Sequence, residues 1–496
     1  MNHSKALSFL PVLLPAALSL AACSGPKTGT VCTTNCGGGD ATVSFTLAAV
    51  PFTPPPGTST LSFGLTLSSV QLTPSSGSVV NIPLNAVTYA VDLTRLQSDS
   101  AFLGQALANV PAGTYNKVTV GVTSAVVTYC TDLLGTSGCD TGSVAQVSQT
   151  TASTPATSTF SATLAASQHA AVQIQFNFAN AITISTASPQ VVSKVDLNAA
   201  NVLTASTLAP TSSTSSLATG QLDFVEDVTG MVTAASSTSV TVKTSTRGSI
   251  TATVNQSSLV LPNCVTTPGL ACVSTVGQFA SIDAALNSDG TFALLEYDPI
   301  APTSSDWIEG IVTSTPLSPT QFQIVTNDIF LASANSLIGS NLSLGAPVQV
   351  TLAGVKPFFV DGKGFFVVTT PFTSGSTDAT NIIPGQTVAL HVTKFTAKNG
   401  NVLAAANVDT LVLRYTRVAG SISTVPGPTF NIQSLPPFFG PTTSYNVQLS
   451  TGSPSTNYDG VSSASGLTVG HTAAMRALFF GPLFTPAFTA AKVRQF

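Results

Sequence analysis

From residue 41 onward, apolar and polar residues alternate with a period of two. Residues 43–47 alternate Val, Phe and Leu with hydroxyl residues, and residues 172–178 alternate Val, Ile and Phe with amides. Residues 118–122 place Val at every second position. Alternation of this kind gives each strand one buried face and one solvated face. We therefore expect an all-β fold that begins with a β-sandwich domain over residues 41–205.

Two local departures from this pattern carry their own predictions. In residues 61–72 the apolar positions change phase near Ser68-Ser69, and a change of phase predicts a β-bulge. Residues 93–107 hold the only plausible short helical pattern of this domain, with apolar residues at 93, 96, 102, 103 and 107. We therefore expect residues 61–72 to form one strand with a bulge, and residues 93–107 to include a short helical stretch between strands.

Short Gly-centred motifs recur beyond residue 220. The first motif occurs as Thr229-Gly230-Met231-Val232-Thr233, Glu309-Gly310-Ile311-Val312-Thr313 and Ala419-Gly420-Ser421-Ile422-Ser423. The second motif occurs as Val276-Gly277-Gln278, Pro384-Gly385-Gln386 and Val469-Gly470-His471. A β-like run follows each copy, and internal repetition predicts an array of small β modules. Chance recurrence of common strand and turn patterns is the alternative.

The repeats set the predicted domain boundaries. Residues 206–220 are rich in Ser, Thr, Ala and Pro and carry no charge, which is typical of a linker. Small β-barrel-like modules are then expected at residues 221–300, 301–418 and 419–496. Because the motif glycines are unequally spaced, the middle module is expected to contain an insertion.

Two resemblances accompany this organisation. Three segments of the first domain resemble a family of bacterial envelope-lipoprotein domains of unknown function: Val91-Asp92-Leu93-Thr94-Arg95-Leu96, Val110-Pro111-Ala112-Gly113-Thr114-Tyr115, and Lys117 to Val122. The repeats resemble small β-barrel repeats of unknown function from similar envelope proteins. The first resemblance covers a third of the chain and implies a fold, but it carries no known catalytic residues.

The N-terminal segment predicts export and a lipid anchor. A short basic start precedes an apolar run over residues 6–20, and small residues follow at 21 and 22. This order is typical of an export signal, and the run is shorter than the about 20 residues that span a bilayer. Leu20-Ala21-Ala22-Cys23 resembles a lipoprotein lipobox, which implies lipidation of Cys23 after residues 1–22 are removed. A buried helix and an ordinary export signal cut elsewhere are the alternatives.

The segment that follows Cys23 predicts a spacer and a location. Residues 23–40 contain Gly25-Pro26 and Gly37-Gly38-Gly39 without an apolar pattern, which is typical of a flexible tether. By the lipoprotein resemblance, Ser24 rather than Asp after the lipidated Cys favours the outer membrane. The chain is therefore expected at the bacterial outer membrane, facing the periplasm or the cell surface, and no transmembrane helix is expected after the signal.

Charge is scarce along the sequence. Charged residues make up 7% of the chain, against about 25% in ordinary soluble domains, and the formal net charge is −4. Ser and Thr take the place of charge on the polar faces of the predicted strands. Because the sequence contains no basic patch, no nucleic-acid partner is expected.

The cysteines form local pairs. Beyond Cys23, six remain, and they pair by proximity as Cys32 with Cys36, Cys130 with Cys139, and Cys264 with Cys272. An even number in close pairs is typical of disulfides in an oxidising compartment. Metal binding is the alternative, but it needs about four ligands, and His169, His391 and His471 are all distant from the pairs in sequence. We expect three disulfides, no metal and no cofactor.

Few residues suggest catalysis. The sequence has no motif of a serine hydrolase, a zinc protease, a phosphate loop or a calcium loop. Asp223, Glu226 and Asp227 form its densest acidic group, and paired carboxylates are the groups that glycoside hydrolases use. We expect these three residues instead to solvate the start of the first module. His391 is expected at the surface, because it occupies the polar face of its strand.

Aromatic clusters are the remaining candidates for a binding site. They occur as adjacent pairs: Phe358-Phe359, Phe438-Phe439 and Phe479-Phe480. Exposed pairs would form an apolar docking surface. Buried pairs would belong to the module cores, which is the usual place of large apolar side chains. The single Trp and the seven Tyr make a carbohydrate-binding surface less favoured.

Together these features predict a lipid-anchored envelope protein with a structural or binding role and without catalysis. Its expected partners are the membrane, through the anchor, and an envelope protein or a polysaccharide. One alternative is a polysaccharide hydrolase that uses carboxylates such as Asp223 and Asp227. Another is a substrate-capture lipoprotein that uses the Phe clusters.

Overall fold

The computed structural model describes most of the chain beyond residue 39. The described residues are 40–52, 59–131, 138–139, 143–149, 155–185, 191–209, 217–255, 258–260, 276–301, 305–314, 316, 318–332, 334–354, 357–367 and 377–496. They belong to one compact unit.

Five of the seven cysteines lie outside the described residues. They are the predicted lipidation site Cys23, the predicted partners Cys32 and Cys36, and the predicted partners Cys264 and Cys272. The structure therefore tests neither the lipid anchor nor two of the three expected disulfides, and these stay predictions.

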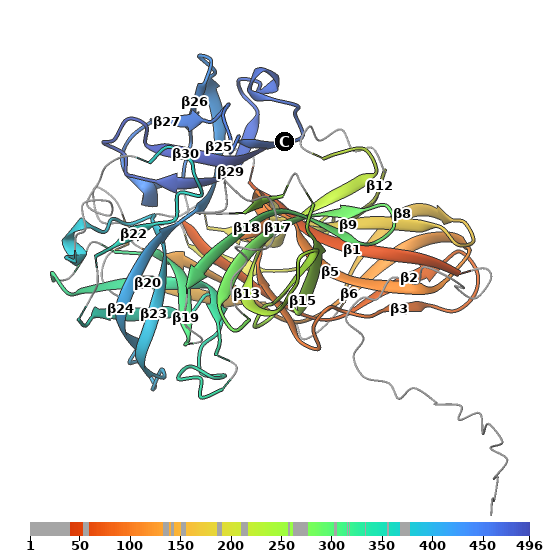
Figure 1. Ribbon diagram of the computed structural model, residues 1–496, viewed down its shortest axis with the longest axis horizontal. Coiled ribbons are helices and arrows are strands. Elements are labelled where there is room, and N and C mark those ends of the chain that lie inside the picture. The colour runs from red at the N-terminus through yellow and green to blue at the C-terminus, as the bar shows by residue number, and fades with distance from the viewer. Residues whose placement is uncertain are drawn as a thin grey trace, which may run out of the picture. The chain divides into compact units, whose positions relative to one another are not determined.

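The fold is nearly all β, as predicted, and two sheets build the first domain (Figure 1). One sheet has the order β12 (Leu203–Leu208), β9 (His169–Asn177), β1 (Asp40–Val50) and β5 (Ala101–Pro111). The other has the order β3 (Val80–Ile82), β2 (Thr60–Pro74), β6 (Gly113–Cys130) and β7 (Val144–Ser148), with β4 (Tyr89–Asp92) on β2 and β8 (Ala156–Leu164) on β6. A short helix, α1 (Phe178–Ala181), and the hairpin of β10 (Ile182–Ile184) and β11 (Val192–Val195) complete the domain.

The core of the first domain lies between its sheets, but β1 is buried on both faces. Phe45 points into the core as the alternation predicts, and it is fully buried. Ser44 and Thr46, on the polar face, are also buried. The Thr46 hydroxyl donates to the Asp223 carboxylate at 2.6 Å, so a residue that follows the first domain in the chain covers this face.

The two local predictions had different outcomes. The register of β2 against β6 shifts between Leu67 and Ser69, which confirms the predicted bulge. The helical pattern reduces to one 3₁₀ turn, η1 (Arg95–Gln97). From Ala101 the chain is strand β5, because its backbone pairs with β1 and this pairing overrides the local helical spacing.

Three further sheets follow, and they share one strand order. The first is β15 (Ser249–Thr253), β14 (Ser239–Lys243), β13 (Gln221–Ala235), β17 (Phe279–Asn287), β18 (Phe292–Ala301) and β16 (Leu259–Val260). The second is β21 (Pro347–Leu352), β20 (Gln321–Phe330), β19 (Trp307–Val312), β23 (Thr387–Thr396), β24 (Ala404–Arg414) and β22 (Phe359–Val360). The third is β27 (Ser444–Leu449), β26 (Thr429–Gln433), β25 (Thr416–Thr424), β29 (Thr472–Phe479), β30 (Phe488–Gln495) and β28 (Asn457–Asp459). We name them the first, second and third barrels.

Closure differs among the barrels. β21 pairs with β24 over five residues and β27 with β30 over three, in parallel, so the second and third barrels are closed. The first barrel is joined between β15 and β18 only at Thr253 and Ala293. Without the short last strand of each sheet (β16, β22 or β28), five main strands remain in each barrel. Their cyclic order is that of a small Greek-key barrel of the OB type. Three one-turn 3₁₀ segments decorate the second and third barrels: η3 (Ala379–Asn381), η4 (Pro437–Phe439) and η5 (Ala464–Gly466).

The recurrent glycines have a structural reason. Gly230, Gly310 and Gly420 lie in the first strand of their barrels, where a Cβ atom would come 2.1, 2.6 and 2.5 Å from a carbonyl oxygen of the second strand. Only Gly allows this approach, because real Cβ contacts are never so short. The glycines of the second motif have φ of +98°, +91° and +89°, a conformation that other residues rarely adopt. They turn the chain into β17, β23 and β29.

One predicted disulfide lies within the described residues and is confirmed. Cys130 at the end of β6 is bonded to Cys139. The segment that it holds contacts two barrels: the Gly138 N–H donates to the Phe438 carbonyl at 2.9 Å, and the Cys139 N–H donates to the Thr313 carbonyl at 2.7 Å. The disulfide therefore fastens the first domain at its contact with the second and third barrels.

Candidate functional site: a buried ionic junction and the cleft beside it

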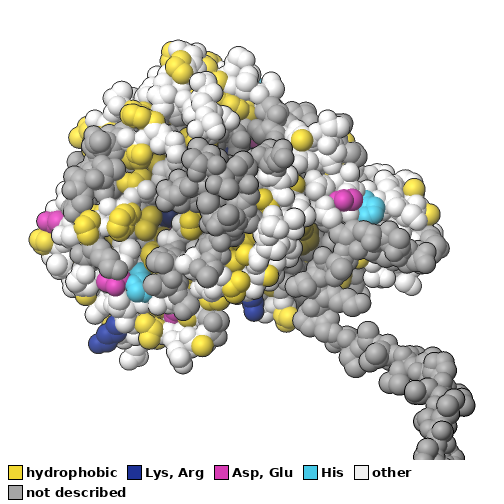
Figure 2. All heavy atoms as spheres, in the orientation of Figure 1, with side chains coloured by type: hydrophobic (Ala, Val, Ile, Leu, Met, Phe, Trp, Pro, Cys, Tyr) yellow, Lys and Arg dark blue, Asp and Glu magenta, His cyan; other side chains and the backbone are white. Residues whose placement is uncertain are grey.

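Half of the charged residues of the sequence lie in one buried network between the first domain and the three barrels. Figure 2 shows a surface on which charged side chains are sparse. The network, named here the ionic junction, joins the basic residues Arg95, Arg247, Lys363, Arg414, Arg417, Arg476, Lys492 and Arg494 to the acidic residues Asp99, Glu226, Asp227, Asp283, Glu296, Asp298, Glu309, Asp328, Asp361 and Asp459. No side chain in it is more than 19% exposed.

The first domain reaches the junction through its 3₁₀ turn. Arg95 contacts Asp227 of the first barrel, and its Nη1 donates to Glu309 of the second barrel at 2.6 Å. Asp99 accepts from Arg417 Nε of the third barrel at 3.1 Å. The turn and the residues just after it therefore connect all three barrels to the sandwich.

The first and third barrels carry opposite charges at equivalent positions. Asp227 and Arg417 each stand three residues before the motif glycine of their barrel. Asp283 and Arg476 each stand six residues after the second motif glycine. Arg417 donates to Asp227, and Arg476 donates to both oxygens of Asp283 at 3.1 and 2.6 Å. The two barrels therefore meet through corresponding strands of opposite charge.

Opposite charges also occupy equivalent positions on the next strand of each barrel, β18 in the first and β30 in the third. Glu296 lies opposite Asp283 across β17 and β18, and Lys492 lies opposite Arg476 across β29 and β30. Lys492 Nζ donates to Glu226 of the first barrel at 2.5 Å. In the second barrel Trp307 and His391 occupy positions that correspond to Asp227 and Asp283. At these two positions the second barrel therefore contacts the first through an apolar cluster around Trp307, while Arg247–Asp328, Lys363–Glu296 and Arg414–Asp298 join the same two barrels by ion pairs.

Burial and pairing move the pKa values of the junction in opposite directions. Burial alone would raise the pKa of Asp283, but Arg476 beside it lowers this pKa to about 2. Burial would also raise the pKa of Glu309, but the arginines around it lower this pKa to about 2. For Glu226 burial outweighs the attraction of Lys492 and raises the pKa to about 7. Glu226 Oε1 has no hydrogen-bond partner among the described residues, which is consistent with this incomplete compensation.

The prediction that Asp223, Glu226 and Asp227 solvate the first module is wrong. All three are buried, at 6%, 2% and 3% exposure. They begin β13, which is covered by the first domain and the third barrel. Asp223 accepts from Thr46 at 2.6 Å and from Gln173 at 3.0 Å. These carboxylates are thus engaged by cations and hydroxyl or amide donors.

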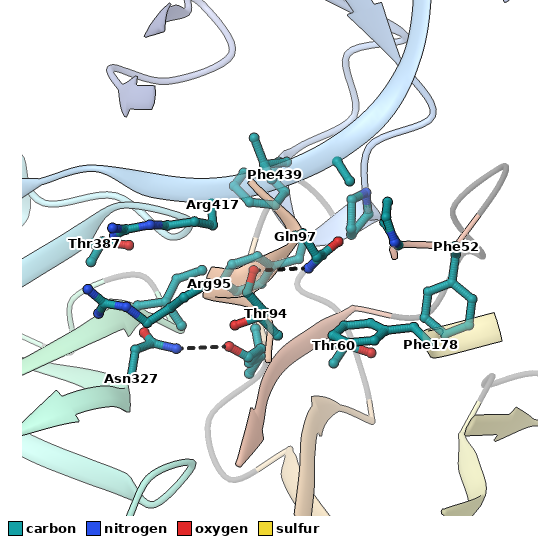
Figure 3. Close-up of a pocket in the computed structure, with 17 residues that line it drawn as sticks. Phe52, Thr60, Thr94, Arg95, Gln97, Phe178, Asn327, Thr387, Arg417 and Phe439 are labelled. Carbon is teal, nitrogen blue, oxygen red and sulfur yellow. Dashed lines mark hydrogen bonds between the residues drawn. The ribbon is translucent and has the colours of Figure 1, made fainter. Parts of the chain in front are cut away.

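A cleft opens at the edge of the junction, between the first domain and the second and third barrels (Figure 3). The space inside it that the centre of a water molecule can reach is about 70 Å³. The lining residues are Pro51, Phe52, Thr60, Leu61, Thr94, Arg95, Gln97 and Phe178 from the first domain, Ile311, Asn327 and Thr387 from the second barrel, and Arg417, Val418, Ala419, Pro436, Phe438 and Phe439 from the third. Arg95 and Arg417 are the charged residues among them.

The cleft has an aromatic part and a polar part. In Figure 3, Phe52 and Phe178 lie at one end of the view and Arg95 and Arg417 at the other. Phe52 packs edge-on against Phe178, with ring centres 6.1 Å apart. Two buried donor groups, Arg95 Nε and Thr60 Oγ1, have no hydrogen-bond partner in the described part of the chain. No local pattern in the sequence indicates this combination, because its residues come from three domains.

The structure buries most of the predicted Phe clusters. Phe358, Phe438, Phe439, Phe479 and Phe480 are at most 4% exposed, and Phe359 is 51% exposed. Phe439 packs against Phe479 with ring centres 5.4 Å apart, so these clusters belong to barrel cores. Phe438 and Phe439 also form one wall of the cleft. An exposed apolar docking surface made of the three pairs is not what the structure shows.

His391 is not the exposed surface residue that its strand position predicts. Its side chain is 16% exposed, and Nδ1 lies 2.5 Å from the Asp409 carboxylate. Its ring lies 5.4 Å from that of Trp307. Among the described residues no group of three or more His, Cys, Asp or Glu side chains is arranged to hold a metal ion.

Comparison with known protein families gives a match in the first domain. Residues 49–194 match a family model described as a domain of unknown function, DUF4382. The matched range lies within the sandwich domain and includes the segments that carry the family resemblance. No curated protein matches the chain. Within the described residues, no helix has the length and apolar character to cross a bilayer.

Proposed function

We propose that this chain is a lipid-anchored protein of the bacterial cell envelope that acts by binding a ligand in the cleft. The observation that carries the binding role is a cleft that combines Phe walls from two domains with two arginines. Ligand sites of this kind are concave, mostly apolar, and hold a few placed polar groups. The lipobox pattern that ends at Cys23 and the Cys130–Cys139 disulfide support an anchored protein in an oxidising compartment.

The ionic junction supports a binding role through rigidity. The side chains that form the polar end of the cleft are held from behind: Arg95 by Glu309 and Asp227, and Arg417 by Asp99. A site whose polar groups are fixed before the ligand arrives loses less entropy on binding. The hydrolase alternative relies on Asp223 and Asp227, whose engagement with other side chains favours a structural role for them.

The anchor and the ligand are tested together on protein isolated from envelopes. Cells that express wild type, Cys23→Ala or Gln97→Trp are grown with radioactive palmitate. Label is expected on wild type and Gln97→Trp but not on Cys23→Ala. Native mass spectrometry of wild type is expected to show an added small-molecule mass that Gln97→Trp lacks, because the indole would fill the centre of the cleft (Figure 3). Equal labelling of all three would refute the anchor, and identical masses would refute the cleft as the binding site.

A further inference from the structure

We propose that the outer face of the first domain carries a second binding site, which takes a polysaccharide whose sugar rings bear anionic groups. A shallow groove crosses β2, β6 and β8 there, and its lining residues are Thr73, Pro74, Asn116, Lys117, Thr159 and Phe160. The space in it that the centre of a water molecule can reach is about 580 Å³, against about 70 Å³ in the cleft. Small-molecule sites usually measure about 300–1,000 Å³, so the groove has room for sugar rings.

Strand pairing sets a polar row across the groove. Thr73 on β2 and Thr159 on β8 are both register partners of Lys117 on β6. Register partners on adjacent antiparallel strands project from the same face of a sheet. The Lys117 side chain therefore lies between two Thr side chains, one from each neighbouring strand.

A bulge in the same strands brings two further side chains to the groove. Asn116 has no partner on β2, because the residues on either side of it pair with adjacent residues of that strand. On β8, Phe160 and Ser161 together stand opposite Asn116. Alternation along β8 would turn Phe160 into the core like Ser158 and Ala162, but Phe160 is half-buried where they are buried. Bulges re-aim side chains and are frequent beside functional sites.

Lys117 gives the groove a charge that a ligand can use. It is the only ionisable side chain of the lining. Lys194 of the same domain pairs with Asp196 at 2.7 Å, whereas no acidic side chain in the described part of the chain pairs with Lys117. The arginines of the cleft differ, because Arg95 and Arg417 are already paired with carboxylates of the junction. An ammonium group without a counterion favours an anionic ligand group, a carboxylate or a phosphate.

The other groups of the groove fit a sugar. The Thr hydroxyls and the Asn116 amide can both donate to and accept from sugar hydroxyls. Phe160 and Pro74 are half-buried and offer an apolar surface to the C–H face of a sugar ring. A single Lys attracts an anionic membrane only weakly, so the neutral hydrogen-bonding groups favour a polysaccharide over a lipid surface.

The test measures the binding of anionic and neutral sugars to the full chain as isolated from cells. The probes are tetragalacturonate with its methyl ester, and phosphorylated maltotetraose with unmodified maltotetraose. Isothermal titration calorimetry gives the Kd of each. We expect at least one anionic probe to bind about tenfold or more tightly than its uncharged counterpart, because only the anion forms a charge-assisted hydrogen bond with Lys117. The tighter anionic probe identifies the ligand group as a carboxylate or a phosphate.

Two variants and a control place this binding in the groove. Lys117→Gln keeps a polar side chain and removes the charge, so the anionic probe is expected to bind about tenfold more weakly. Thr159→Glu puts a carboxylate opposite Lys117 at an exposed position, and a loss of similar size is expected because the new carboxylate competes with the ligand. Lys243→Gln removes the same charge from an exposed position on β14 and is expected to bind as wild type does.

The contrary outcomes are distinct. Equal affinity for charged and uncharged probes would overturn the anionic ligand. Wild-type affinity in Lys117→Gln and Thr159→Glu would overturn the groove as the site. The inference would also fail if none of the four sugars bound while the chain sedimented with phosphatidylglycerol vesicles in a way that Lys117→Gln abolished, since the groove would then bind a lipid surface.

Discussion

Arg476 and Asp283 are both buried, and two hydrogen bonds join their side chains. Moving an ion out of water costs several kcal/mol, so a buried pair persists only where geometry and further hydrogen bonds compensate. Asp283 meets this condition, because its Oδ1 also accepts from the Asp227 N–H at 2.7 Å. Lys194 and Asp196 form a contrast: they are 2.7 Å apart, but the Lys194 side chain is 51% exposed.

Asp283→Asn is expected to lower the free energy of unfolding by about 3–5 kcal/mol, because it leaves the Arg476 charge buried without its counterion. Lys194→Ala is the control, with an expected loss of about 0–1 kcal/mol, because solvent screens the exposed pair. Denaturant unfolding followed by circular dichroism measures both. If the two variants lost equal stability, the junction would not behave as a buried ionic network.

At the scale of single residues, the sequence indicated some of the site and missed the rest. The bond between Cys130 and Cys139 was predictable because its members are nine residues apart and can meet within one loop. Phe439 was a candidate and does line the cleft. Arg95 and Glu309 were not candidates, because 214 residues separate them and only domain docking brings them together.

At the scale of elements, the recurrent glycines show how much a motif specifies. The first motif marks the strand on which a neighbouring backbone passes too close for any side chain, and the second marks the turn before the fourth strand. Both were visible in sequence, because each depends on local backbone geometry. The charges at corresponding positions were visible too: aligning the motifs places Asp227 against Arg417 and Asp283 against Arg476. Opposite charge at aligned positions of two repeats is a signal that could have predicted their contact.

Gly420→Ala is expected to destabilise the third barrel by about 1–3 kcal/mol, because the new Cβ would lie 2.5 Å from the Gln433 carbonyl oxygen of the neighbouring strand. Gly452→Ala is the matched control. Its new Cβ would have no neighbour closer than 3.9 Å, so little change is expected. Thermal unfolding of the two variants measures the difference. A Gly452→Ala loss as large as that of Gly420→Ala would contradict the close-approach explanation.

At the scale of the whole molecule, the junction makes stability depend on pH in two opposite ways. The pKa of Glu226 is raised by burial, so its stabilising contribution is complete below the unfolded pKa of 4.5 and is lost as pH rises through about 7. The pKa values of Asp283 and Glu309 are lowered by their cations to about 2. Their contribution is complete above the unfolded values of 3.8 and 4.5 and is lost as pH falls toward 2.

The melting temperature is therefore expected to rise as pH falls from about 8 to about 5, and to drop steeply below about 4. Glu226→Gln is expected to flatten this rise, because an amide does not titrate, and to lower stability mainly above about pH 7, where Glu226 would face Lys492 as a carboxylate. Differential scanning calorimetry at unit pH steps measures both curves. A Glu226→Gln curve parallel to that of wild type between pH 8 and 5 would show that Glu226 does not titrate there.

The sequence alone determined the all-β class, the positions of many strands, the bulge in β2 and the Cys130–Cys139 bond, because each follows from residues close together in the chain. It also determined the glycines that the barrels need. Tertiary structure decided that β1 is buried on both faces, that the acidic start of β13 is buried, and that Phe52 and Phe439 line one cleft. These features depend on which surfaces of the domains pack against each other. The alternation of apolar and polar residues in a strand is the same whether or not another domain packs on its polar face, so the sequence pattern does not reveal that packing.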